Sequence, residues 1–130
     1  MQFTCDSTGR TPIYRQLIEQ IRERVARGKL EPGERLPSVR QLSKDLVVNP
    51  NTVARAYTEL EREGVLNTRP GLGVFVAKPQ AGLKAEVRRR RLSELIDRLL
   101  TEAVHLGVTA EDVRNLIDSR MRQFQFGEAS

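Results

Sequence analysis

Hydrophobic residues recur at helical spacing in the first part of the chain and predict an amphipathic helix there. Thr11 is placed to cap this helix, Pro12 occupies its first position, and Gly28 ends it. Its apolar stripe consists of Ile13, Leu17, Ile18, Ile21 and Val25. Residues 29–37 follow as a connector rich in turn-forming residues.

Two further helices are expected after this connector. Ser38 can cap a short second helix, with Gln41 as its capping-box partner. Asn49 caps a third helix that has Pro50 at its first position and ends at Gly64. The inward positions of the two helices are Val39, Leu42, Leu46, Val53, Ala56, Tyr57 and Leu60. The opposite face of the third helix is polar and carries Asn51, Thr52, Arg55 and Thr58.

A small hairpin is predicted next, from β-type segments at 65–68 and 74–77 that are joined by the glycine-containing turn 69–73. Three helices with short turns and then a hairpin are the element order of a winged helix-turn-helix. In that fold, packing anchors the third helix while its polar face meets base edges in the DNA major groove. We therefore expect a mainly α chain in which residues 1–78 form such a domain.

The rest of the chain, residues 79–130, is predicted to contain two amphipathic helices after a boundary at 78–82. The first runs to about Gly107, and Thr109 caps the second. Because each helix has a single apolar stripe, the pair cannot close a core alone and must pack on the winged domain or on a second copy. We expect a homodimer, which would match a palindromic operator. Its interface is assigned to Leu92, Leu95, Ile96, Leu99 and Leu100.

Charge and the scarcity of reactive side chains narrow the functional class. A formal net charge of +5 favours a polyanionic partner such as DNA. The basic run Arg88–Arg91 is more typical of a solvated helix face than of a DNA contact, and the sequence leaves both interpretations open. Cys5 is the single cysteine, which excludes an internal disulfide and a thiolate zinc site. His105 is the single histidine and is interpreted as a helix-end residue, so no enzyme, metal or cofactor is expected.

Localisation and ligands follow from the same patterns. The N-terminus lacks the features of a signal peptide, and no apolar run is long enough to span a membrane, so a cytoplasmic protein is expected. A small-molecule effector, if one binds, is expected at the dimer or domain interface. The sequence does not identify it.

Four motifs resemble the GntR family of bacterial transcriptional regulators. In chain order they are PIYxQL from Pro12, LxPGxRLPSxRxLS from Leu30, NPNTVARAYxELExEG from Asn49 and RxGxGxFV from Arg69. The short two-helix tail resembles the YtrA-like subfamily. The resemblance implies DNA contacts at Arg35, Ser38, Arg40, Asn49, Asn51, Thr52, Arg55, Arg69 and Gly71, of which the last two lie at a wing tip that enters the minor groove. Ala54 departs from those members that carry arginine there.

Two other functional classes compete with sequence-specific binding. A winged helix can dock proteins, but such a face would be expected to carry aromatic anchors rather than Asn51, Thr52 and Arg55. An architectural DNA binder would show salt-sensitive binding with little sequence preference. We predict a sequence-specific DNA-binding regulator, expected to be a homodimeric repressor.

Overall fold

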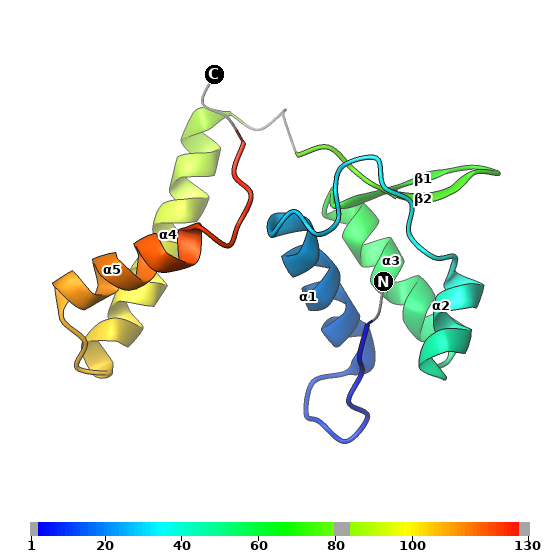
Figure 1. Cartoon of the computed structure of the whole chain (residues 1–130), viewed down its shortest axis with the longest axis horizontal. Helices are drawn as coiled ribbons and strands as arrows, with labels where there is room; N and C mark the ends of the chain where they lie inside the picture. The colour runs from blue at the N-terminus through cyan, green and yellow to red at the C-terminus, as the bar shows by residue number, and fades with distance from the viewer. Residues whose placement is uncertain (1–2, 80–83, 128–130) are drawn as a thin grey trace. The chain divides into compact units, whose positions relative to one another are not determined.

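The computed structural model describes residues 3–79 and 84–127, which belong to two compact units. The first unit ends at Pro79 and contains three helices and a two-stranded antiparallel hairpin, and the second contains two helices (Figure 1). The elements are α1 (Ile13–Ala26), α2 (Val39–Leu46), α3 (Pro50–Arg62), β1 (Leu66–Arg69), β2 (Gly73–Val76), α4 (Ala85–His105) and α5 (Ala110–Met121). The predicted class, mainly α with a small hairpin, is confirmed.

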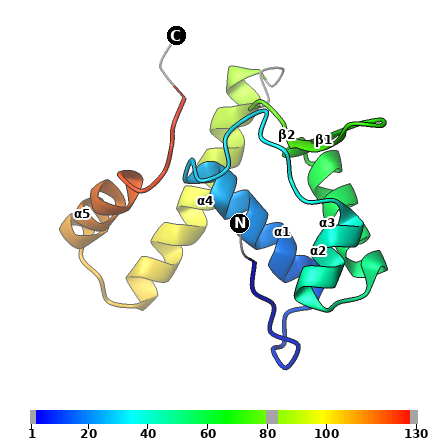
Figure 2. The same ribbon diagram turned by 45° about the vertical axis from the view of Figure 1, so that its right-hand side comes forward.

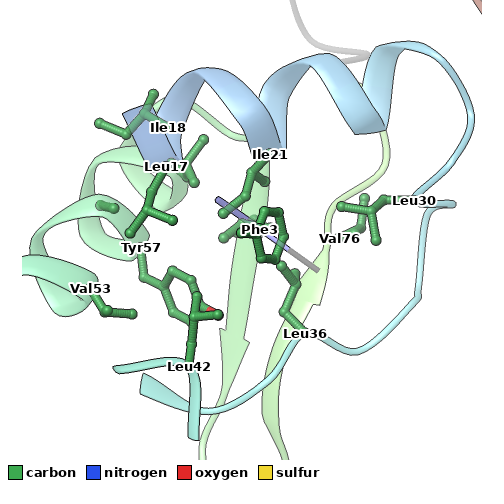
Figure 3. Close-up of a cluster of buried hydrophobic side chains, with 13 residues drawn as sticks. Phe3, Leu17, Ile18, Ile21, Leu30, Leu36, Leu42, Val53, Tyr57 and Val76 are labelled. Atoms are coloured by element: carbon green, nitrogen blue, oxygen red, sulfur yellow. The ribbon is translucent and has the colours of Figure 1, made fainter. Parts of the chain in front are cut away.

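The core of the first unit forms around α3, which packs against α1, α2 and β1. Figure 3 shows side chains from all three helices and the hairpin meeting in one cluster. The predicted inward positions of α3 are all buried, and Leu17, Ile18 and Ile21 of α1 face them. Phe3, Leu30 and Leu36, which lie outside any helix or strand, complete the cluster. The core therefore fixes α3 from several sides.

The helix ends match the sequence prediction except at the start of α1. Pro12, not Thr11, is the N-cap, and its carbonyl accepts the first helical hydrogen bond from the Gln16 amide at 3.1 Å. The Thr11 prediction is wrong because the Thr11 carbonyl is instead bound by the Gln16 side chain. After α1 and α3, Gly28 and Gly64 adopt positive φ angles, the conformation that glycine supplies after a helix.

The hairpin strands lie one residue away from their predicted positions. The observed register pairs Leu66 with Val76 and Arg69 with Gly73. Residues 33–36 also run along the free edge of β2, where the Gly33 and Leu36 amides donate to the Val76 and Val74 carbonyls at 2.8 and 2.9 Å. This third segment ties the hairpin to the residues directly before α2.

Two glutamines of α1 hold the N-terminal segment along the helix. Gln20 accepts from the Thr4 amide and donates to the Thr4 carbonyl. Gln16 does the same for Asp6, at 2.8 and 2.9 Å. Because the two glutamines are one helical turn apart and Thr4 and Asp6 are alternate residues, the side-chain amides imitate the hydrogen bonding of a neighbouring strand. This glutamine clamp holds Phe3 in the core.

Tyr57 links α3 to the residue before the cap of α2. Its hydroxyl donates to the Pro37 carbonyl at 2.7 Å, and burial raises the pKa of the phenol, so it remains a neutral donor. We expect Tyr57→Phe to lower the free energy of unfolding by about 1 kcal/mol and the melting temperature by about 5 °C. Thermal unfolding followed by circular dichroism measures this. Tyr14→Phe is the control, because the Tyr14 hydroxyl has no hydrogen bond within the described residues; equal stability of the two variants would contradict the prediction.

The second unit contains no buried side chain among residues 84–127. Thr109 caps α5 as predicted, accepting from the Asp112 amide at 3.1 Å, and His105 lies in the last turn of α4. Side chains of both helices line an apolar groove of about 500 Å³ that includes Leu99, Leu116 and Ile117. The predicted boundary at 78–82 extends into residues 80–82, which lie outside the described residues.

Candidate nucleic-acid interface

The turn between α2 and α3 orients the first residues of α3. Val47 ends α2 in the left-handed conformation, with φ 55°, and its side chain is exposed. Asn49 then caps α3 by accepting from the Asn51 amide at 2.8 Å, as predicted. This bond leaves the Asn49 side-chain NH₂ and the whole Asn51 side chain directed to solvent, since both residues are exposed. Thr52 is half-buried.

Ser38 and Arg40 lie at the start of α2. The Ser38 hydroxyl accepts from the Gln41 amide at 3.0 Å and so caps the helix as predicted. The reciprocal half of the predicted capping box is wrong, because the Gln41 side chain donates to Asp45 at 2.7 Å instead. Arg40 is exposed and makes no ion pair with the described residues, so its guanidinium is available to an external anion or base.

Arg55 is positioned by an aromatic ring that the sequence analysis did not single out. Its guanidinium carbon lies 3.7 Å from the ring centroid of Tyr14, which belongs to α1, and that of Arg15 lies 5.5 Å from the same ring. Cation–π contact restrains the arginine while leaving its N–H edge free for hydrogen bonding. The signal was present in the PIYxQL motif, but spacing along the chain does not indicate that Tyr14 and Arg55 meet.

Arg35 and Arg69 are brought together on the wing by Gly73. Arg69 is paired with Gly73 in the hairpin, and its guanidinium lies 4.6 Å from the ring centroid of Phe75. A Cβ atom on Gly73 would lie only 2.9 Å from the Arg35 Nε and would displace that side chain, and the φ of 126° is a conformation that favours glycine. Two cations thus converge at one side of the hairpin.

The wing tip is a tight turn formed by residues 69–72. The Leu72 amide donates to the Arg69 carbonyl at 2.9 Å, with Pro70 and Gly71 as the central residues. Proline followed by a glycine of positive φ, here 76°, is typical of a type II turn. Figures 1 and 2 show the hairpin extending away from the helices of its unit. Gly71 is exposed, which fits a residue that permits close approach of the backbone to a ligand.

The nine DNA-contact residues implied by the resemblance fall into three groups in the structure. Ser38 and Arg40 lie at the start of α2, and Arg35, Arg69 and Gly71 lie on the wing. The others, Asn49, Asn51, Thr52 and Arg55, lie in or beside the first two turns of α3. All except the half-buried Thr52 are exposed. The structure adds Tyr14, Gly73 and Phe75 as residues that position arginines.

We expect Tyr14→Leu to weaken binding to a DNA duplex, selected for tight binding from a random pool, by about two- to fivefold. The reason is that the cation–π contact that restrains Arg55 is lost. Tyr14→Phe keeps the ring and should bind like the wild type. Fluorescence anisotropy with a labelled duplex measures both. If Tyr14→Phe lost as much affinity as Tyr14→Leu, the hydroxyl rather than the ring would be the relevant group.

Comparison with known proteins identifies the family. Residues 13–76 match the description "Bacterial regulatory proteins, gntR family". The chain is also 38% identical to the HTH-type transcriptional repressor YtrA of Bacillus subtilis (strain 168), over 86% of each protein. The chain belongs to the GntR family. It is therefore a DNA-binding transcriptional regulator, and the predicted likeness to YtrA-like members is confirmed.

Two solved structures are similar to this GntR chain, and one of them was solved with DNA. A transcriptional antiterminator from Listeria monocytogenes EGD-e has a TM-score of 0.77 and 32% identity, with coverage of 100% of this chain and 97% of that one. The AraR DNA-binding domain, solved in complex with operator ORX1, has a TM-score of 0.52 and 26% identity, with coverage of 58% and 100%. These relatives are regulators rather than enzymes.

Residues 3–79 and 84–127 contain no helix that is long and apolar enough to cross a membrane. The same ranges contain no group of three or more histidine, cysteine, aspartate or glutamate side chains placed to hold a metal ion. The candidate site is the surface formed by the start of α2, the start of α3 and the wing.

Proposed function

We propose that this GntR regulator is a homodimeric repressor that recognises a palindromic operator. The observation that carries the proposal is the α3 N-terminus, where a capped and core-anchored helix presents Asn51 and the restrained Arg55 to solvent. Rigid polar groups at this position suit hydrogen bonding to base edges in the major groove. The relative YtrA is named a repressor, and the AraR domain binds an operator, which supports the same role here.

The region 79–130 that the sequence assigns to dimerisation, which includes α4 and α5 of the second unit, supplies the dimer interface in this proposal. Its support is the exposed apolar stripe of α4, in which Leu92, Leu95 and Leu99 are 58, 56 and 45% exposed. Association with a second copy would remove this apolar stripe from water. The two-fold symmetry of such a dimer would place two recognition helices on two half-sites. An effector, if one binds, is assigned to the apolar groove that α4 and α5 line. In this proposal the regulator acts in the cytoplasm, where bacterial DNA lies.

Selection of duplexes from a random pool, followed by competition with scrambled DNA, tests this proposal. A specific operator binder enriches a defined sequence with two related halves and resists scrambled competitor. Enrichment of no sequence, with equal competition by scrambled DNA, would indicate an architectural binder. Absence of any DNA binding would favour a protein-docking module.

Helix and wing are expected to contribute differently to binding. Arg55→Ala should lose affinity mainly for the selected duplex and flatten the preference among variants, because base pairs are distinguishable in the major groove. Arg69→Ala should weaken binding to all duplexes. If its contact is to phosphate, the salt slope, which is the slope of log affinity against log salt concentration, should fall in magnitude by about 1. Both variants are titrated on selected and scrambled DNA across a salt series. The reverse pattern would exchange the two roles.

A further inference from the structure

The positive charge of the chain is concentrated in two places, of which only one is the winged unit. Residues 1–79 contain thirteen basic and nine acidic residues, a net charge of +4. Residues 84–91 alone contain five basic residues and one acidic residue, again +4. Residues 92–130 contain four basic and seven acidic residues, a net charge of −3. The second unit is therefore strongly basic only at the end that follows the winged unit.

These basic residues, Lys84 and Arg88–Arg91, are here called the arginine turn and occupy the N-terminal end of α4. All five are exposed, and within the described residues none of their side chains has an ion-pair or hydrogen-bond partner. Lys84 and Arg88 lie in or beside the first turn, where the helix dipole disfavours cations, and Arg88 is at repelling distance along the helix from both Lys84 and Arg91. An external anion beside this turn would offset that repulsion.

The length of the connecting chain limits how far the arginine turn can lie from the winged unit. Residues 80–84 join Pro79 to Ala85, and even a fully extended link of this length spans only about 20 Å. β2 starts at the wing tip and runs away from it, so the link leaves at the base of the hairpin, where the Ala77 amide donates to the Val65 carbonyl at 2.9 Å. The four residues of β2 span about 13 Å, which is less than the reach of the link. When the winged unit binds DNA, the phosphates beside the wing are consequently the polyanion at the highest local concentration.

We propose that the arginine turn binds the DNA backbone beside the operator, as a second contact that does not read sequence. The inference rests on the proposed operator binding. Successive arginines on a helix are rotated by about 100° from one another, so they surround α4 rather than line one pocket. Such a distribution suits phosphates along a groove better than a single small anion. The arginine turn therefore adds affinity, whereas α3 and the start of α2 supply preference.

The test replaces all four arginines, Arg88–Arg91, by glutamine in the full chain, with replacement by lysine as the matched control. Glutamine keeps the helix propensity, and lysine keeps the charge. On both the selected and the scrambled duplex, the glutamine variant should bind about tenfold more weakly, with a salt slope smaller by about 1 to 2 per protomer. The lysine variant should bind within about twofold of the wild type. The ratio of the two affinities should remain that of the wild type.

Thermal unfolding and sedimentation of the same variants separate a DNA contact from a structural role. Removing cations from the helix N-terminus should leave the melting temperature equal or higher, and the sedimenting mass unchanged. A lowered melting temperature or changed mass in the glutamine variant, with the lysine variant equally affected, would overturn the proposal in favour of a packing role.

Three further results would overturn the proposal. The first is unchanged affinity and salt slope in the glutamine variant while the wild type still prefers the selected duplex. The second is a changed affinity ratio, which would make the arginine turn a sequence reader. The third is loss of binding to phosphatidylglycerol vesicles with DNA binding intact, which would assign the arginine turn to a membrane surface. If the wild type itself prefers no duplex, the proposed operator binding fails first, and this inference fails with it.

Discussion

Leu99→Asp is expected to convert the dimer to a monomer and to abolish operator binding at concentrations where the wild type is saturated. Burial of one leucine contributes about 1.5–3 kcal/mol, and two-fold symmetry removes that contribution from both protomers. A carboxylate in the same apolar contact adds a desolvation cost. We therefore expect the dimer dissociation constant to rise by about two to four orders of magnitude. Sedimentation equilibrium measures the mass, and Leu95→Asp should behave in the same way.

The matched control for this prediction is Val104→Asp. Val104 is on α4 and 75% exposed, but it lies off the stripe that contains Leu92, Leu95 and Leu99. The same change of charge on the same helix should therefore leave the mass and the DNA affinity unaltered. A wild-type chain that sediments as a monomer at micromolar concentration, with no change in Leu99→Asp, would refute the dimer.

Arg40→Ala is expected to lower affinity for the selected duplex by about 5- to 150-fold while the fold remains intact. A bidentate arginine contact to a guanine edge contributes about 1–3 kcal/mol of discrimination against other bases. Arg40 is exposed and has no ion-pair partner in the described part of the chain. Removing its side chain should therefore change the free energy of unfolding of the unbound protein very little. Anisotropy titration on the selected duplex gives the change.

Arg62→Ala is the control for Arg40→Ala. Arg62 ends α3, far along the helix from Asn51, and pairs with Glu59 at 2.6 Å on the surface. Exposed pairs of this kind contribute little, so stability and DNA affinity should both stay near the wild type. Unaltered DNA binding in an Arg40→Ala protein with normal circular dichroism would remove Arg40 from the reading surface.

Local signals in the sequence predicted most of the first unit. Ser38 and Asn49 identify helix starts because a side-chain oxygen satisfies a specific backbone amide, and both do so in the structure. The helical spacing of apolar residues also predicted the buried face of α3, because helical geometry determines which residues share a face. The start of α1 was misplaced because Thr11 and Pro12 both suit a cap, and a side chain four residues into the helix, Gln16, decided between them.

Contacts between distant segments account for what the sequence did not predict. Phe3 has no neighbours in a periodic pattern, so its burial depends on α1 supplying the glutamine clamp. Residues 33–36 looked like a connector, yet they extend the hairpin because β2 leaves an edge for them. The pairing of Tyr14 with Arg55 and the preference for glycine at position 73 arise in the same way. Periodicity carries information about one element, not about the element it meets.

The dimer interface and the DNA contacts differ from contacts within the chain, because they involve a second molecule. An apolar stripe indicates that a surface must be covered, and exposed arginines indicate an affinity for anions, but neither identifies the partner. The exposure of the α4 stripe and of Arg40 is compatible with those predictions. They stay predictions until binding and sedimentation are measured.

The glutamine clamp also bears on how the N-terminal segment can diverge among relatives. Gln16 and Gln20 bind the backbone amide and carbonyl groups of Thr4 and Asp6, groups that nearly every amino acid offers, and Gln16 also donates to the Thr11 carbonyl. Proline is the exception, because it lacks the amide hydrogen. The identity of residue 4 is therefore free to drift over evolution, whereas a large apolar side chain at position 3 and both glutamines should persist. Asp6 is under a separate constraint, because its carboxylate accepts from the Thr8 amide and hydroxyl at 2.9 and 2.7 Å. An ordered segment of this kind would look only partly conserved in an alignment while keeping its conformation.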